Sequence, residues 1–204
     1  MNTSARARRL SARTLAALLL TLACAALLTH HAAADVDSNP RSQDGFKVTT
    51  VYLVRHAEKA DAPPEDPPLS EAGRARAQEL ARVLGGAGVR AVYTSQFLRT
   101  KQTAEPLAKQ LGLAPAALSI RMNPASPREP SAESIKEITD KIYERAGETT
   151  LVVGHSNTVP EVIRALGGDA VPKIDEKKFD DLFVLTVYGR GKAKVAQLKY
   201  GSAN

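Results

Sequence analysis

A short apolar run that ends in an arginine and a histidine constrains this chain most strongly. Residues 51–54, VYLV, are typical of a buried strand, and Arg55 and His56 follow directly. Such polar side chains are costly to place at the end of a buried strand unless they have a partner. In open α/β sheets, ligands bind at the carboxyl ends of the strands. Arg55 and His56 therefore predict a site for an anionic group such as phosphate.

The first 34 residues predict a leader rather than part of a folded domain. Four arginines precede an Ala- and Leu-rich run over residues 14–28, and three alanines stand before Asp35. This order is typical of a secretory signal peptide, which predicts a protein exported to the periplasm or secreted, without stable membrane insertion after cleavage. One alternative is a retained membrane anchor, although a spanning helix needs about 20 apolar residues. Another is a lipoprotein signal at Cys24, which the preceding residues 21–23, TLA, fit poorly.

Removing this leader changes what the composition indicates. The chain has 28 basic and 22 acidic residues, and four of the basic ones lie in the leader, which leaves 24 against 22. With no basic surplus, and with only five Tyr and four Phe to form an aromatic platform, the composition argues against nucleic-acid binding. Cys24 is the only cysteine, so the part after the leader has no disulfide, no catalytic thiol and no cysteine-ligated metal.

Strands and helices are predicted to alternate after the leader. Residues 35–46 are polar and predict a flexible linker, and residues 47–204 predict a single domain. Apolar runs predict strands over residues 48–54, 89–93, 149–153, 182–187 and 194–198, with a further strand at 118–121. Apolar residues at helical spacing predict helices over residues 70–84, near 104–111, and over 131–145 and 157–166. Such alternation predicts a three-layer α/β/α fold with a largely parallel sheet, and the last two strands predict an antiparallel hairpin at one edge.

Prolines mark two places where the pattern leaves alternatives. Residues 61–68, DAPPEDPP, form a stiff acidic loop just past Arg55 and His56, which either walls the site or is plainly solvated. Pro106 either kinks its helix or lies in the first turn of a helix capped by Thr103.

Polar residues follow three of the predicted strands. Arg55 and His56 follow the first, Thr94-Ser95 and then Arg99 follow the second, and His155 follows the third. Parallel strands place their carboxyl ends at one edge of a sheet, so we expect two arginines and two histidines to converge there. His56 and His155 are the only histidines outside the leader, which favours a functional role for both.

Two arginines and two histidines suit phosphoryl transfer. The guanidinium fork binds phosphate oxygens bidentately. A neutral imidazole can attack phosphorus and form a phosphohistidine, and a second imidazole can hold an oxygen or move a proton. The helix predicted after His155 adds backbone N–H groups suited to an anion. Two histidines without nearby acidic ligands make a poor zinc site, so we expect neither a metal nor a cofactor.

Three segments, VYLVRHAEK, VYTSQFLRTKQTAEPLA and TTLVVGHSNTVPEVI, resemble the signature blocks of the histidine phosphatase superfamily, also called phosphoglycerate mutase-like. The resemblance spans about residues 48–187 and implies the phosphoglycerate mutase-like fold. It implies a metal-independent phosphatase acting on a small phosphorylated substrate. It also implies that His56 is the phosphorylated nucleophile and that Arg55, Arg99 and His155 complete the phosphate pocket.

The chain departs from the family's pattern at one residue and leaves another role open. Ala57 stands where the family usually has the glycine of Arg-His-Gly, so we expect this loop to avoid a conformation that only glycine tolerates. Glu58 matches a frequent glutamate of the family, either as a proton donor or as a residue that orients an arginine. The family's general acid usually lies after the second block, where Glu129 and Glu133 are the nearest candidates.

Three other functions match parts of the pattern. A serine hydrolase is excluded, because Thr158 replaces the last glycine of the Gly-x-Ser-x-Gly motif at residues 154–158 and no histidine follows His155. A phosphomutase of this family generally carries larger insertions than the roughly 170 residues after the leader provide. A non-catalytic phosphate-binding or interaction module stays open, and turnover would discriminate it. The sequence predicts neither the natural substrate nor the oligomeric state.

Overall fold

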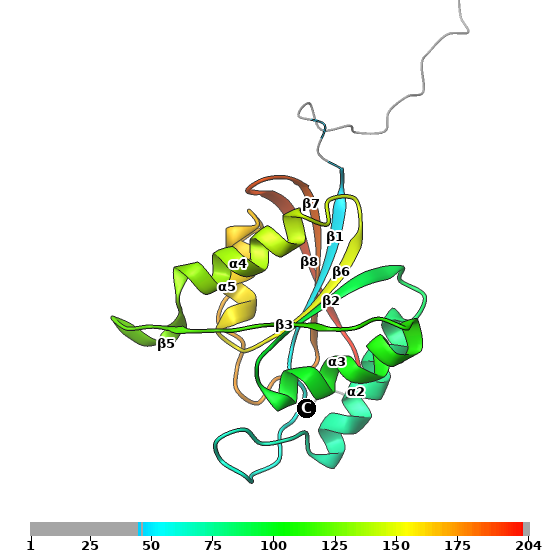
Figure 1. Cartoon of the computed structure of the whole chain (residues 1–204), viewed down its shortest axis with the longest axis vertical. Coiled ribbons are helices and arrows are strands. Elements are labelled where there is room, and N and C mark those ends of the chain that lie inside the picture. The colour runs from blue at the N-terminus through cyan, green and yellow to red at the C-terminus, as the bar shows by residue number, and fades with distance from the viewer. Residues whose placement is uncertain (1–44, 46, 202–204) are drawn as a thin grey trace, which may run out of the picture. The chain divides into compact units, whose positions relative to one another are not determined.

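The computed structural model describes residue 45 and residues 47–201, so the predicted signal peptide and nearly all of the predicted linker lie outside the described residues. Its centre is a six-stranded sheet (Figure 1). In spatial order the strands are β3 (Ala116–Leu118), β2 (Val89–Ser95), β6 (Thr149–Gly154), β1 (Thr49–Arg55), β7 (Asp181–Gly189) and β8 (Lys192–Lys199). The first four are mutually parallel, and β7 and β8 form an antiparallel hairpin at one edge.

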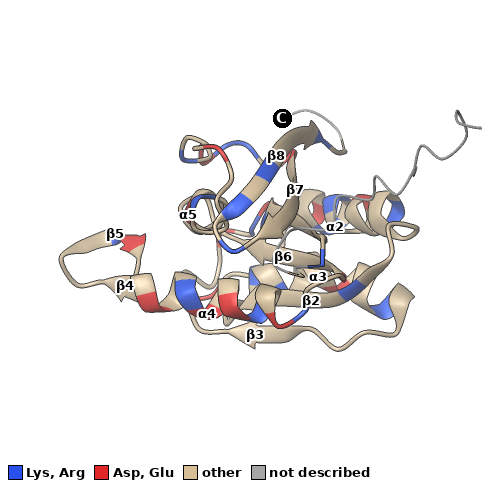
Figure 2. Cartoon of the chain, turned by 90° about the horizontal axis from the view of Figure 1, so that it is seen from above, with Lys and Arg blue, Asp and Glu red and all other residues tan. Residues whose placement is uncertain are grey.

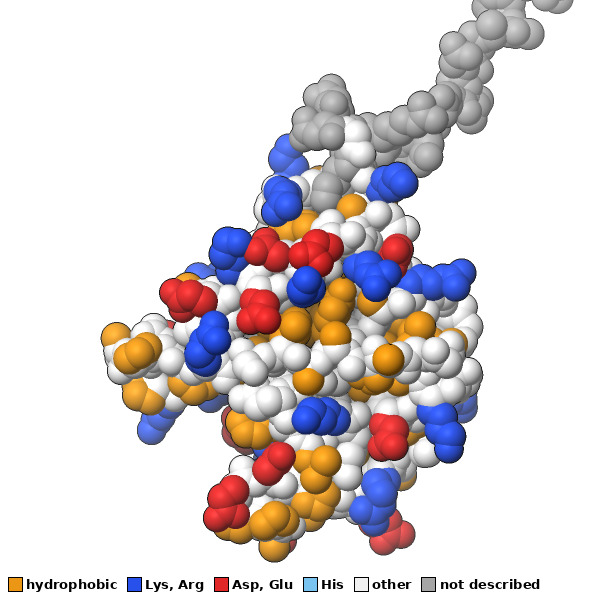
Figure 3. Space-filling model, in the orientation of Figure 1, with side chains coloured by type: hydrophobic (Ala, Val, Ile, Leu, Met, Phe, Trp, Pro, Cys, Tyr) orange, Lys and Arg blue, Asp and Glu red, His pale blue; other side chains and the backbone are white. Residues whose placement is uncertain are grey.

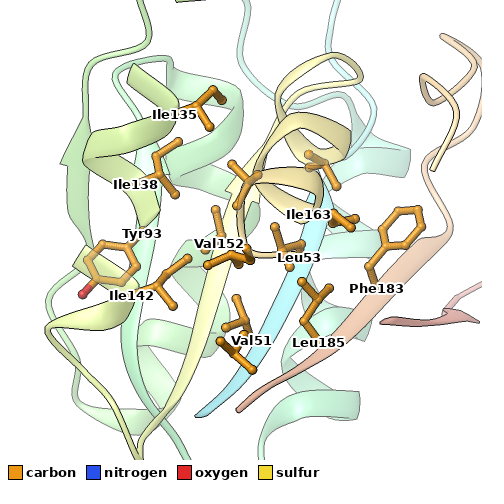
Figure 4. Packing of buried hydrophobic residues seen from close by; sticks show 14 of the residues in the cluster. Val51, Leu53, Tyr93, Ile135, Ile138, Ile142, Val152, Ile163, Phe183 and Leu185 are labelled. Atoms are coloured by element: carbon orange, nitrogen blue, oxygen red, sulfur yellow. The ribbon is translucent and has the colours of Figure 1, made fainter. Parts of the chain in front are cut away.

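Four helices cover the two faces of this sheet. One face packs against α2 (Glu71–Leu84) and α3 (Leu98–Leu111), and the other against α4 (Ala132–Tyr143) and α5 (Thr158–Ala165). Figure 4 shows Ile135 and Ile138 of α4 facing strand residues Leu53 and Val152 in one of these layers. The α/β class and the largely parallel sheet predicted from the sequence are therefore confirmed. Among the described residues, no helix combines the length and apolar character needed to cross a bilayer.

Alternating side chains of the central strands build both layers of the core. In β1, Val51 and Leu53 join the cluster under α4 and α5, whereas Val54 joins the cluster under α2 and α3. Because both faces of the strand are covered, its sequence is a continuous apolar run rather than an alternating one. The ribbon of Figure 2 marks charged residues on helices, loops and β8, and on the face in Figure 3 basic and acidic side chains are interspersed.

Serine caps two of the helices at the residue before their first turn. Ser70 accepts a hydrogen bond from the Gly73 N–H at 3.1 Å, and Ser131 accepts one from the Ser134 N–H at 3.3 Å. Each cap satisfies a backbone donor that the first helical turn would otherwise leave unpaired.

The start of α3 differs from the prediction. Pro106 lies inside the helix and Thr103 is an interior residue, so the Thr103-capped alternative is wrong. Asp66, 32 residues earlier, supplies the cap instead, because its carboxylate accepts from the Leu98 N–H at 2.9 and 3.1 Å. A cap from such a distant residue leaves no local sequence signal.

Residues 114–130 are more structured than predicted. The expected strand at 118–121 lies at β3 instead, and β4 (Met122–Asn123) pairs with β5 (Ser126–Pro130) in a short hairpin of its own. β4 has only two residues and β5 contains two prolines, and both strands are largely exposed, so they carry too little apolar periodicity to be predicted.

Helix α2 packs closely on the chain that follows β1. A Cβ added at Gly73 would lie 2.0 Å from the backbone oxygen of Glu58, and this oxygen already accepts from the Ser70 N–H at 2.9 Å. A glycine at residue 73 therefore allows the helix to hold the segment next to His56 in place.

We expect Gly73→Ala to lower the free energy of unfolding by about 1–3 kcal/mol, because backbone rather than a flexible side chain must move. The matched control is Gly86→Ala, where an added Cβ meets nothing within 4 Å. Urea unfolding of both variants checks this, and equal stabilities would contradict it.

Candidate active site

His56 lies directly after β1, and its hydrogen bond defines which ring nitrogen is free. Its Nδ1 lies 2.8 Å from the backbone oxygen of Ala57. A carbonyl oxygen can only accept, so Nδ1 carries the proton and Nε2 of the neutral ring keeps its lone pair. Burial lowers the pKa of His56 to about 3, and the nearby Arg55 and Arg99 charges lower it further. At neutral pH the structure therefore presents an uncharged imidazole with a free Nε2.

His155 follows β6 and lies beside His56, with 5.4 Å between the ring centroids. Its Nε2 lies 2.9 Å from the Ser95 hydroxyl at the end of β2, and Phe97 packs edge-on against its ring at 5.5 Å. Burial lowers the pKa of His155 to about 3, with smaller effects from His56 and the arginines. The second imidazole is thus also neutral and is held by a neighbouring strand.

Arg55 is the last residue of β1 and is buried. Its Nη1 donates to the backbone oxygens of Asp175 and Lys178 at 2.9 and 3.1 Å, and its Nη2 donates to Glu176 at 2.8 Å. The guanidinium lies over the Phe179 ring at 4.2 Å. Its Nε is buried and has no partner among the described residues. Burial lowers the pKa of Arg55, but arginine stays charged in proteins.

Arg99 lies in the first turn of α3 and completes the cationic part of the site. Its Nη1 is 3.6 Å from the Asp66 carboxylate, and its guanidinium stacks on Phe97 at 4.3 Å. Burial lowers the pKa of Arg99, and the negative charge of Asp66 offsets part of this effect. Stacking and pairing together fix the direction of its donors.

These four predicted residues line one pocket of about 360 Å³. Arg55, His56 and His155 come from the ends of adjacent strands, and Arg99 comes from the helix after a third. The proline-rich loop at residues 61–68 forms one wall through Pro64, Glu65 and Pro67, so the alternative in which this loop walls the site is confirmed. Two guanidiniums beside two neutral imidazoles can bind an anion and attack it.

In the part of the chain that the structure describes, no group of three or more His, Cys, Asp or Glu side chains is placed to hold a metal.

The predicted acidic residues lie outside this pocket. The Glu58 carboxylate accepts hydrogen bonds from Nε and Nη2 of Arg76 at 2.8 to 3.0 Å. This is the geometry of a residue that orients an arginine. Glu129 lines a different hollow of about 930 Å³ between α4 and α5. Glu133 is exposed in the first turn of α4, where hydrogen bonds to its own backbone and to Ser131 lower its pKa. The structure therefore does not bring Glu129 or Glu133 to the histidines.

Sequence reasoning missed several residues that support the site. Thr103 accepts from the Ala57 N–H at 2.9 Å and donates to the Arg99 backbone oxygen at 2.7 Å, which ties the His56 loop to α3. Ser156 donates to Glu176 at 2.7 Å. The segment 175–179, DEKKF, surrounds Arg55 but has the composition of a solvated loop. Its proximity to a buried arginine has no signal in local sequence.

Comparison with known proteins agrees with this geometry. The sequence profile of the histidine phosphatase superfamily (branch 1) matches residues 51–123, which include Arg55, His56 and Arg99. The resemblance to the histidine phosphatase superfamily is confirmed. No curated protein sequence matches the chain.

Solved structures with the histidine phosphatase fold are similar over most of the chain. One is the protein histidine phosphatase SixA complexed with tungstate, with 20% identity, a TM-score of 0.58, and coverage of 74% of this chain and 96% of the other. A phosphoglycerate mutase from Bacillus anthracis has 19% identity, a TM-score of 0.58, and coverage of 75% and 93%. A mycobacterial glucosyl-3-phosphoglycerate phosphatase has 15% identity, a TM-score of 0.57, and coverage of 77% and 100%. At identities of 15 to 20%, these similarities show that the fold is shared and nothing further.

The two buried histidines predict that stability falls on acidification. Each has a pKa of about 3 when folded against about 6.5 when unfolded, so between these values the unfolded state binds protons that the folded state lacks. The free energy of unfolding should therefore decrease as pH falls from about 6.5, by up to about 1.4 kcal/mol per pH unit for each histidine.

Urea unfolding between pH 6.5 and 5, above the range in which most carboxylates titrate, measures this slope. His56→Asn removes one of the two titrations, so its slope should be smaller than that of the wild-type protein. An identical slope in both proteins would contradict the neutral state of buried His56.

Proposed function

We propose that this chain is a phosphatase that hydrolyses phosphate monoesters through a phosphohistidine on His56, without a metal ion. One observation carries the proposal: the Ala57 carbonyl holds the proton of His56 on Nδ1, in a pocket shared with two arginines and a second neutral histidine. A neutral imidazole is nucleophilic, and its free Nε2 needs no base to remove a proton first.

The reaction has two steps in which His56 is first the nucleophile and then the leaving group. In the first, the Nε2 lone pair attacks phosphorus, and the bond to the ester oxygen breaks with its electrons on that oxygen. Arg55 and Arg99 hold the other phosphate oxygens, where charge must be stabilised in the transition state. In the second, water attacks phosphorus and the electrons of the N–P bond return to Nε2.

The Arg55 guanidinium gives this scheme a fixed cation. Backbone oxygens and Glu176 hold it through Nη1 and Nη2, so a phosphate would bind beside a group that is already oriented. His155, held by Ser95, would contact another oxygen or move a proton. The substrate would be a small phosphorylated molecule, as the similarity to a glucosyl-3-phosphoglycerate phosphatase suggests.

The leader at residues 1–34 supports export to the periplasm or secretion as part of the proposal. Similarity to a phosphoglycerate mutase keeps phosphate transfer between two positions of one substrate as an alternative. Turnover of an aryl phosphate to free phosphate would distinguish hydrolysis from transfer and from binding alone.

We expect His56→Ala to abolish release of the phenol from an aryl phosphate, with excess chelator leaving wild-type turnover unchanged. Arg99→Ala should lower kcat and raise KM, because it removes charge stabilisation in both the bound state and the transition state. Arg82→Ala is the matched control, since that arginine is exposed and pairs only with Glu79 among the described residues.

Wild-type activity in the His56→Ala protein would contradict the mechanism. Absence of turnover in the wild-type protein, with phosphate bound in the pocket, would favour the non-catalytic binding module.

A further inference from the structure

We infer that Glu65, in the proline-rich loop at residues 61–68, donates the proton to the leaving-group oxygen of the substrate. The inference rests on the proposed function and adds a catalytic residue to it. The reaction needs such a group because an alkoxide is a poor leaving group, and a positioned acid contributes about 10²–10⁴-fold in rate.

Only two carboxylates line the pocket among the described residues, Glu65 and Glu176. Both oxygens of Glu176 are engaged, since Oε1 accepts from Ser156 at 2.7 Å and Oε2 pairs with Arg55 at 2.8 Å. A proton on Glu176 would weaken the ion pair that holds Arg55. Glu65 makes no hydrogen bond or ion pair with any other described residue, so its carboxyl group is free to carry a proton.

The loop that carries Glu65 is fixed on both sides. Asp66, the next residue, accepts from the Leu98 N–H at 2.9 and 3.1 Å and lies 3.6 Å from Arg99. At the base of the loop, the Ala60 N–H donates to the Pro68 oxygen at 2.8 Å. Prolines on either side of Glu65 and Asp66 further restrict the backbone. Glu65 is therefore held next to the arginine that binds phosphate.

The loop lies beyond the carboxyl end of β1, at the sheet edge where the histidines lie. Figure 1 shows it as the cyan segment between β1 and α2, and Figure 3 shows acidic side chains beside apolar ones at this end of the molecule. A phosphate held by Arg55 and Arg99 would have its ester oxygen on the side away from His56, because the nucleophile and the leaving group lie in line. Glu65 lines the same pocket, where its carboxyl group would meet that oxygen.

The proton transfers balance over the two steps. As Nε2 of His56 attacks phosphorus, the ester P–O bond breaks, its electron pair stays on oxygen, and that oxygen takes the proton of the Glu65 carboxyl group. The carboxylate then takes a proton from the water that attacks the phosphohistidine, the N–P bond electrons return to Nε2, and the acid is regenerated.

The test is a series of aryl phosphates whose leaving phenols differ in acidity. A phenol made acidic by a nitro group leaves without help, whereas phenol itself needs a proton. Glu65→Gln should retain kcat/KM for 4-nitrophenyl phosphate within about threefold and lose about 10²-fold or more for phenyl phosphate. Retained activity on the activated ester also shows that the variant is folded.

Three further variants make the result specific. Glu105→Gln, an exposed glutamate of α3 outside the pocket, is the matched control and should match the wild-type protein on both esters. Glu176→Gln and Glu133→Gln test the other carboxylates. A loss that is equal for all leaving groups in Glu65→Gln, or a leaving-group-dependent loss in Glu176→Gln or Glu133→Gln instead, would overturn the inference. Absence of turnover in the wild-type protein on every ester would overturn the proposed function itself.

Discussion

The burial of a guanidinium at the end of β1 is the constraint on which the site depends. A buried cation is costly unless hydrogen bonds and an opposite charge compensate it. For Arg55 the compensation comes from two backbone oxygens, the Glu176 carboxylate and the Phe179 ring, all between α5 and β7. The same contacts therefore fix the arginine and attach that segment to the sheet edge. They leave Nε buried and without a partner among the described residues.

The same burial determines the chemical state of the histidines. Desolvation and two nearby guanidiniums both disfavour imidazolium, so His56 and His155 are neutral well below pH 7. A phosphoryl acceptor needs this state, since a protonated ring has no lone pair to attack with. Arginine keeps its charge under the same desolvation, whereas histidine loses it. One buried edge can thus hold permanent cations beside neutral nucleophiles, a division of roles that follows from the two side chains' ordinary pKa values.

The sequence predicts the parts of this arrangement that depend on regular structure. Apolar runs that end in polar residues place Arg55, His56 and His155 at one sheet edge, because parallel strands share their carboxyl ends. It does not predict contacts made by irregular segments. Glu176 and Asp175 lie about 120 residues from Arg55, and Asp66 caps α3 from 32 residues away, so neither contact follows from local spacing. For the same reason a cap is one of two alternatives that the sequence leaves for Thr103, whose hydroxyl instead accepts from the Ala57 N–H from inside α3.

Loops rather than the sheet therefore set the charge balance that a substrate meets. Each arginine of the pocket has a protein carboxylate beside it, Glu176 for Arg55 and Asp66 for Arg99, and both carboxylates lie on loops. These pairs reduce the repulsion between two nearby guanidiniums, so the donors are oriented before a phosphate arrives and need little reorganisation in the transition state. Because β1 and β6 place Arg55 and the histidines at the sheet edge, the residues of loops 61–68 and 175–179 that contact neither Arg55 nor α3 can vary in shape and charge without loss of the fold. Substrate choice among chains of this fold should consequently follow these two loops, as function generally follows loops on a fixed scaffold.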